Sequence, residues 1–282
     1  MHNRRFGVVV RSTGERTERA VLDALNVDSH VEEVVVIRQQ TPLYVAAAKT
    51  HEIFSQWVER YDYAFSIDAD VIPFPGFGTW ISEIINKAPY PSFSRWLPPL
   101  LDWVIQGRWR TAGGIFIYRT EHSAEIAQRT WELMDLIEPE HNYDIYKYLP
   151  GAEWRPTLEQ SGEIVSIHQY AQDWSEYFYR GMVHRIRKKN WFRPGLHQLI
   201  ASGDPEALVF MAGYDWATTN QDFLNFENAA LRDTTRFRME LDNYLKRIGL
   251  PLTRDNCPSY IDLVSEITKS LPSGIKLIPY TK

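Results

Sequence analysis

The sequence contains one cysteine, Cys257, in 282 residues. A single cysteine excludes an internal disulfide and a zinc site built from cysteines, and it fits a chain that works in the reducing cytoplasm. Long apolar runs are also missing. No stretch approaches the roughly 20 residues of a membrane-spanning helix, and the apolar run near the N-terminus is too short for a signal peptide. We therefore expect a cytoplasmic protein without a membrane span.

Positive charge is not in excess either. The formal net charge of -5 at pH 7 gives no overall attraction to nucleic acid or to an anionic membrane, so a local patch must bind any such partner. Hydrophobic residues make up 44% and charged residues 24% of the chain, which excludes a disordered or fibrous protein. A chain of this length can form one large domain or two small ones.

Short apolar runs rich in β-branched residues alternate with helical patterns in the first half of the chain. Such runs are typical of strands that are covered on both faces. The predicted strands are 6–10, 33–37, 63–67 and 114–118, with helices predicted at 17–25 and 44–61 between them. This alternation predicts an α/β fold with a mostly parallel central sheet and helices on both faces. The proline-rich segment 88–101 is predicted to be a surface excursion.

Two carboxylates, Asp68 and Asp70, follow the third predicted strand in the segment "SIDADVIPF". In open parallel sheets, ligands bind beyond the carboxyl ends of the strands. Two hard oxygen donors separated by one small residue suit Mg²⁺ or Mn²⁺ carried on substrate phosphates. The alternative is a surface turn in which one of the two carboxylates caps a following helix.

Four segments in this order resemble the GT-A fold glycosyltransferases, whose Rossmann-like domain holds a metal through a D-x-D motif. The segments are "VVVRSTGERTERAVLDAL" (8–25), "YVAAAKTHEIF" (44–54), "FSIDADVIPFPG" (65–76) and "RTAGGIFIYRTEH" (110–122). The resemblance implies a GT-A domain over 1–203, with a nucleotide-sugar half at 1–120 and an acceptor and catalytic half at 121–203. Helical patterns after that domain predict a C-terminal helical extension over 204–282.

The resemblance also implies a metal-dependent transferase that moves a sugar from a nucleotide-diphosphate sugar. The expected donor is a UDP-sugar, and the expected cofactor is Mn²⁺ or Mg²⁺. The residues it assigns to the nucleotide sugar are Arg11, Ser12, Thr13, Arg16, Lys49, Asp68, Gly113 and Gly114. The metal ligands are expected to be Asp68, Asp70 and His184, with His168 and His197 as other candidates. The simpler interpretation of residues 11–16 is a polar turn in which Thr17 caps the next helix.

Inverting members of the family need an acidic base, and the segment "HQYAQDWSEYFYRG" offers Asp173 and Glu176. The acidic pair usual in the family is Gln172 and Asp173 here, which departs from the pattern. Glu159 and Asp222 are rival candidates, so the choice between inversion and retention stays open.

The acceptor side is suggested by a basic segment at 184–193, which mixes Arg and Lys with aromatic residues. The residues expected to contact the acceptor are Arg185, Arg187, Lys188, Lys189 and Trp191. Such a mixture neutralises phosphates and stacks on bases, although it also suits a solvated helix face or a loop over the donor diphosphate. The chain is similar in size and fold class to the phage-type glycosyltransferases that modify 5-hydroxymethylpyrimidines in DNA, which makes modified DNA the expected acceptor.

An extruded DNA base would need an aromatic pocket, for which Trp96, Trp109 and Trp174 are candidates. Three alternatives remain. They are a glycosyltransferase for a surface-polysaccharide or lipid-linked precursor, a nucleotidyltransferase, and a non-catalytic module that binds nucleotide sugars. The loop after the first strand has Gly14 alone, whereas nucleotidyltransferases carry a glycine-rich loop there.

Overall fold

A computed structural model describes residues 4–39, 43–87, 95–132, 153–154, 163–188, 194–220 and 234–278. Within these residues, six strands form the central sheet in the order β2-β1-β3-β8-β5-β9. Their bounds are β1 Phe6–Ser12, β2 Val31–Arg38, β3 Tyr63–Asp68, β5 Arg95–Trp96, β8 Ile115–Arg119 and β9 Glu153–Trp154. All neighbouring strands pair in parallel except β8, which is antiparallel to both β3 and β5. The mostly parallel sheet confirms the predicted α/β fold class.

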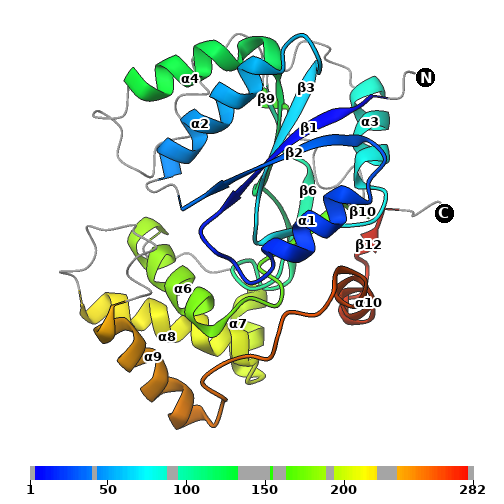
Figure 1. The fold of residues 1–282 in the computed structure, drawn as a ribbon. Coiled ribbons are helices and arrows are strands. Elements are labelled where there is room, and N and C mark those ends of the chain that lie inside the picture. The colour runs from blue at the N-terminus through cyan, green and yellow to red at the C-terminus, as the bar shows by residue number, and fades with distance from the viewer. Residues whose placement is uncertain are drawn as a thin grey trace. The chain divides into compact units, whose positions relative to one another are not determined.

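Helices cover both faces of this sheet. The bounds are α1 Glu18–Asn26, α2 Leu43–Gln56, α3 Phe77–Lys87 and α4 Ser123–Glu132, with a 3-10 turn at Thr120–His122 before α4. Figure 1 shows α2 and α4 on one side of the sheet and α1 and α3 on the other. The side chains agree, because the rings of Phe65 on β3 and Phe77 on α3 pack 5.6 Å apart. On the opposite face, a Cβ atom on Gly7 would lie 2.5 Å from the ring of Trp57.

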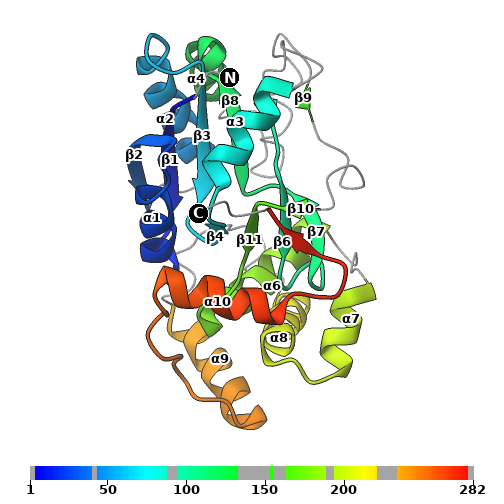
Figure 2. The ribbon, with the colours of Figure 1, turned by 90° about the vertical axis from the view of Figure 1, so that its right-hand side faces the viewer.

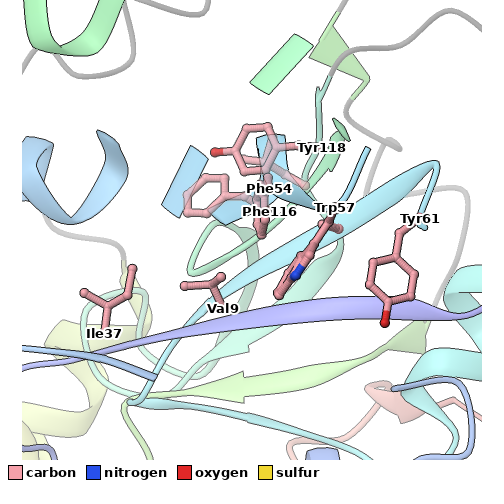
Figure 3. Close-up of a cluster of buried hydrophobic side chains, with 9 residues drawn as sticks. Val9, Ile37, Phe54, Trp57, Tyr61, Phe116 and Tyr118 are labelled. Carbon is pink, nitrogen blue, oxygen red and sulfur yellow. The ribbon is translucent and has the colours of Figure 1, made fainter. Parts of the chain in front are cut away.

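The core between α2 and the sheet is a cluster of buried side chains (Figure 3). Its members are Val9, Ile37, Phe54, Trp57, Tyr61, Ala64, Leu97, Phe116 and Tyr118. The two members on β8, Phe116 and Tyr118, are separated by one residue, so the period of two in a strand places them on the same face. Each large apolar side chain in such a core contributes roughly 1.5–3 kcal/mol through burial.

A second sheet has the order β4-β11-β6-β7. Its strands are β4 Val71–Pro73, β6 Pro99–Asp102, β7 Trp109–Ala112 and β11 Ser166–His168. Strand β11 runs antiparallel to β4, and this pairing sets His168 opposite Val71. Strands of three or four residues carry too few positions to show an alternating pattern, so the sequence does not predict this sheet.

The C-terminal segment returns to the sheets. Helix α10, Tyr260–Ser270, packs against α1, and its Tyr260 hydroxyl donates a hydrogen bond of 3.0 Å to the carbonyl of Pro73 at the end of β4. Strand β12, Lys276–Leu277, then pairs in parallel with β10, Glu163–Ile164 (Figure 2). The strand that follows Asp70 is therefore supported by a segment near the other end of the chain.

The predicted surface excursion at 88–101 is wrong for the described part of that segment, which begins at Arg95. Arg95 is 2% exposed and Trp96 is fully buried. The Arg95 guanidinium lies 4.5 Å from the centre of the Phe116 ring, and Trp96 stacks on Trp80 with ring centres 5.7 Å apart. Prolines mark the ends of strands here because they cannot continue a hydrogen-bonded ladder.

The described residues group into two compact units. One lies within Met1–Leu101, Arg110–His168 and Pro258–Lys282, and the other within Asp102–Trp109 and Gln169–Cys257. The second unit contains the helices α6 Trp174–Lys188, α7 Pro194–Ala201, α8 Pro205–Thr219 and α9 Thr235–Ile248. This grouping differs from the predicted boundary at 203/204, because α6 packs on α8 and α9 while α10 and β12 rejoin the sheets. Among the described helices, none has the length and apolar character needed to span a membrane.

Candidate active site

Asp68 and Asp70 lie at the carboxyl end of β3, the edge at which ligands bind in parallel sheets. The residue between them is held by two other elements. The Ala69 amide donates to the carbonyl of Arg11 at 2.9 Å, and the Ala69 carbonyl accepts from the Thr17 hydroxyl at 2.8 Å. Thr17 makes no side-chain capping bond to α1, so its predicted capping role is wrong. The hydroxyl instead fixes the backbone between the two carboxylates.

The carboxylate of Asp70 is 1% exposed. Its Oδ2 lies 3.2 Å from Nε2 of His168, which the pairing of β11 with β4 brings next to the end of β3. The carboxylate oxygens suit Mg²⁺ or Mn²⁺, whereas an imidazole nitrogen is a softer ligand that suits Zn²⁺ or Fe²⁺ better. In the described part of the chain, no group of three or more His, Cys, Asp or Glu side chains is arranged to hold a metal ion alone.

Asp68 is more accessible than Asp70, with 33% of its side chain exposed. Its Oδ1 lies 2.8 Å from Nη2 of Arg11, the residue directly opposite on β1. The Arg11 guanidinium also lies over the ring of Phe116, 5.5 Å from its centre. This arrangement places a cation and an anion side by side at the sheet edge.

The loop after β1 is closed by Glu15, which the sequence analysis did not single out. Its carboxylate accepts from the Ser12 hydroxyl at 2.9 Å, the Thr13 hydroxyl at 2.6 Å and the Thr13 amide at 2.8 Å. The hydroxyls of Ser12 and Thr13, which were predicted to contact the nucleotide sugar, therefore bind a side chain of their own loop. Arg16 in this loop and Lys49 on α2 are half-buried. Their predicted roles toward the diphosphate stay predictions.

Gly113 and Gly114 precede β8 with φ angles of 137° and 75°, values that favour glycine. A Cβ atom on Gly114 would lie 2.7 Å from Cγ2 of Val71. The Gly114 carbonyl accepts from the Asp68 amide at 2.9 Å. Gly114 thus lies beside the start of β4 and the end of β3, as expected for a loop next to the D-x-D motif.

His51 on α2 is a buried titratable group that packs against the core between α2 and the sheet. Its ring packs edge-on against Tyr118, with centres 4.6 Å apart, and against Phe54 at 5.6 Å. Burial, together with the positive charges of Arg11 and Arg95, lowers the pKa of His51 from 6.5 to about 3. His51 is therefore neutral at physiological pH.

We expect the free energy of unfolding to fall as the pH drops from 6.5 towards 3. In this range the unfolded chain binds a proton at His51 and the folded chain does not, so the free energy of unfolding falls by at most about 1.4 kcal/mol per pH unit. His51→Phe should make the dependence flatter. Urea unfolding at pH 7 and pH 5 measures it, with the exposed His197 as a control in His197→Gln. If the free energy of unfolding changed equally with pH in the wild type and in His51→Phe, the lowered pKa assigned to His51 would be contradicted.

The candidate bases lie in the second unit. The half-buried Asp173 directly precedes α6, and its carbonyl accepts from the amides of Glu176 at 3.0 Å and Tyr177 at 3.2 Å. Glu176 is buried, and its Oε1 lies 2.6 Å from Nε of Arg180. Asp173 is thus the more accessible of the two. The rivals Glu159 and Asp222 lie outside the described residues.

His184, which the sequence favours as a metal ligand, lies on α6 and is 5% exposed. Its ring packs against Phe210 and Tyr214, with centres 5.7 and 6.3 Å away. These surroundings are those of a core histidine, whereas His168 lies next to Asp70. The choice of ligand is not tested by these contacts, but they favour His168.

The basic segment is described only in part. Arg185 is half-buried, donates to the Thr218 hydroxyl at 2.9 Å and lies over the ring of Tyr214, so it packs on α8. Arg187 and Lys188 belong to the last turn of α6, and Lys189 and Trp191 lie outside the described residues. Of the proposed base-stacking aromatics, Trp96 and Trp174 are buried, so neither offers an open ring, while Trp109 is 56% exposed.

No protein-family model matches the sequence, and a search of curated proteins finds no match. Among solved structures, a glycosyltransferase involved in the glycosylation of the major capsid of PBCV-1 is 13% identical, with 59% of this chain and 94% of that chain covered and a TM-score of 0.42. A 4-diphosphocytidyl-2C-methyl-D-erythritol synthase from Anaerococcus prevotii is 5% identical, with coverages of 54% and 87% and a TM-score of 0.35. Likenesses at this level carry no argument about function.

Proposed function

We propose that the protein is a glycosyltransferase that moves a sugar from a nucleotide-diphosphate sugar, preferentially a UDP-sugar, to an acceptor hydroxyl with the help of Mn²⁺ or Mg²⁺. One observation carries this proposal. The buried carboxylate of Asp70 lies two residues after the end of β3 and 3.2 Å from the imidazole of His168. A buried carboxylate at a ligand-binding sheet edge is costly unless a cation or a proton compensates it.

The residues of the first unit fit a divalent cation carried on a diphosphate. Asp70 would hold the cation, with His168 and Asp68 beside it, and the diphosphate oxygens and water would complete the shell, since Mg²⁺ takes few protein ligands. The bound cation supplies positive charge for the leaving diphosphate. Arg11 keeps Asp68 in place through their 2.8 Å ion pair and adds positive charge at the same edge. The sequence favours His184 as the third ligand; the proposal uses His168 in its place.

Asp173 is proposed as the base that takes the proton from the acceptor hydroxyl. It is half-buried at the start of α6, while the carboxylate of Glu176 is engaged by Arg180. General bases of this kind contribute about 100- to 10,000-fold to the rate.

Modified DNA remains the proposed acceptor, on the strength of the basic segment in a chain of net charge -5. Incubation with UDP-glucose and either hydroxymethylated or unmodified duplex DNA tests this. We expect sugar incorporation into the hydroxymethylated duplex alone. Lack of transfer to any modified duplex would remove the DNA acceptor and favour a polysaccharide or lipid-linked precursor.

A thermal-unfolding screen of nucleotide sugars with and without Mn²⁺ tests the donor. A ligand at 100 times its Kd stabilises the folded state by about 2.7 kcal/mol, which raises the Tm of a chain this size by about 5–10 °C. We expect one class of nucleotide-diphosphate sugar to do so in the presence of Mn²⁺. A set of nucleoside triphosphates is the matched comparison, because stabilisation by these alone would indicate a nucleotidyltransferase. No shift with any nucleotide would overturn the proposal.

A further inference from the structure

The segment Gln169–Asp173, which we call the bend, joins β11 to α6 in a strained conformation. Gln169 and Ala171 have φ angles of 61° and 55°, in the left-handed region that side chains other than glycine rarely occupy. Each such residue costs about 1–3 kcal/mol and persists only where surrounding contacts hold it. The bend begins directly after His168 and ends at Asp173.

A buried polar group adds a second cost at the same place. The side chain of Gln169 is fully buried, and neither its amide nitrogen nor its amide oxygen has a hydrogen-bond partner among the described residues. Burial of an unsatisfied amide opposes folding. The two left-handed residues and the unsatisfied amide both lower the stability of the fold. Such a combination is typical of a functional site.

Tyr177 holds the bend from inside the second unit. Its ring is fully buried, and its hydroxyl donates to the Gln169 carbonyl at 2.9 Å and accepts from the Gln172 amide at 3.2 Å. Burial raises the pKa of Tyr177 well above its ordinary value, and the negative charge of Glu206 adds to this effect. The hydroxyl therefore stays protonated and able to donate. One side chain thus ties both ends of the strained turn.

Arg254, near the C-terminal end of the second unit, also contacts the bend. Its Nη1 donates to the Gln172 carbonyl at 2.8 Å and to Oε1 of Glu206 at 2.7 Å. Its guanidinium lies over the Trp174 ring, 4.6 Å from the centre. Since Glu206 also accepts from Trp103 Nε1 at 2.6 Å, the arginine is fixed in one orientation.

We propose that Tyr177 and Arg254 are positioning residues that hold the bend so that the carboxylate of Asp173 is presented for catalysis. The backbone N–H of Gln172 donates a hydrogen bond to the Tyr177 hydroxyl, and its backbone carbonyl accepts one from Arg254. Both backbone groups of the residue directly before Asp173 are therefore fixed. The inference rests on the proposed function, because it takes Asp173 to be the base.

The test uses the full-length protein and Mn²⁺-dependent release of nucleoside diphosphate from the nucleotide sugar that stabilises it. Tyr177→Phe keeps the ring and removes both hydroxyl bonds. We expect it to lower kcat by about 10- to 100-fold with KM unchanged, since small misplacements of a reacting group have effects of this size. Arg254→Met should act in the same way, and Arg254→Lys should restore part of kcat.

Matched controls lie in the same unit. Tyr244→Phe removes a tyrosine hydroxyl bond of 3.1 Å to the Leu208 carbonyl, and Arg247→Met removes an arginine that lies 5.0 Å from the centre of the Tyr244 ring. Both should keep the wild-type kcat. The double variant Tyr177→Phe/Asp173→Asn should be no slower than Asp173→Asn alone, because the two residues act as one unit.

A purely structural role predicts something different. In that case the controls would lose kcat as Tyr177→Phe does, or the double variant would show the product of the two single effects, and either result would overturn the inference. Wild-type kcat in Arg254→Met and Tyr177→Phe would overturn it as well. A wild-type protein that releases no nucleoside diphosphate from any nucleotide sugar would instead show that the proposed function has failed, and the inference with it.

Discussion

Asp70→Asn is expected to abolish Mn²⁺-dependent turnover of nucleotide sugars, with a loss of about 100-fold or more in kcat. The substitution keeps the shape of a side chain that is 1% exposed and removes the charge that would hold the cation. Asparagine has the same shape as aspartate, and a neutral amide costs less to bury than a carboxylate. We therefore expect a folded protein whose Tm no longer rises when Mn²⁺ and the nucleotide sugar are added together, as measured by thermal unfolding.

A half-buried aspartate elsewhere in the same unit gives the matched control. The carboxylate of Asp28 accepts from the amides of His30 at 2.9 Å and Gly78 at 2.7 Å, and it lies away from the D-x-D motif in the sequence. Asp28→Asn keeps an oxygen acceptor and should retain both turnover and the Mn²⁺-dependent shift. If Asp70→Asn behaved like Asp28→Asn, the metal site proposed at β3 would be wrong.

Gly213→Ala is expected to cost the second unit about 3 kcal/mol or more of unfolding free energy. A Cβ atom on Gly213 of α8 would lie 1.8 Å from the carbonyl oxygen of Phe178 on α6, and one on Gly181 of α6 would lie 1.8 Å from the carbonyl oxygen of Phe210 on α8. The two helices thus approach through glycines on each side. An added methyl group forces them apart, and overpacking of this kind typically costs 1–3 kcal/mol, occasionally more.

Helix propensity alone predicts the opposite sign. Alanine is favoured over glycine in a helix interior by about 1 kcal/mol, so Gly213→Ala would be stabilising if the helix were isolated. Urea unfolding followed by tryptophan fluorescence distinguishes the two cases. Gly249→Ala is the control, because Gly249 has a φ of 73° and no atom within 4 Å of its Cβ position, so backbone strain should cost only about 1 kcal/mol. A stabilised Gly213→Ala protein would contradict the close helix packing.

The long strands of the sheet were largely predictable because each contains a continuous apolar run, and β1, β3 and β8 are buried on both faces. The predicted runs 6–10, 33–37, 63–67 and 114–118 all fall within or overlap strands β1, β2, β3 and β8. Continuous apolar runs of this kind require no knowledge of their neighbours. The position of Asp68 and Asp70 at a strand end follows from the same local pattern.

The short strands and the contacts they create were not predictable. Arg95 and Trp96 read as part of a proline-rich loop, yet both are buried because each stacks on an aromatic ring from another element. His168 ends an apolar run, which is a weak local sign of a strand. Its position next to Asp70 depends on the pairing of β11 with β4, whose residues are nearly a hundred positions apart in the sequence.

Glu15 and Arg254 show two different reasons for a missed residue. Glu15 lies within three positions of the hydroxyls that it binds, so the spacing of Ser12, Thr13 and Glu15 held a signal that sequence reasoning could have used. Arg254 carried none, since a single arginine in a proline-containing segment does not indicate which distant carbonyl it will meet.

The sequence by itself determined the α/β class, the positions of the long strands along the chain and the D-x-D motif at the end of β3, because burial and backbone period are encoded locally. The tertiary structure alone decided that His168 lies beside Asp70, and that α6 groups with α8 and α9. Such pairings depend on the packing of segments far apart in the chain. Their energy arises only when the segments meet, so no local pattern records it.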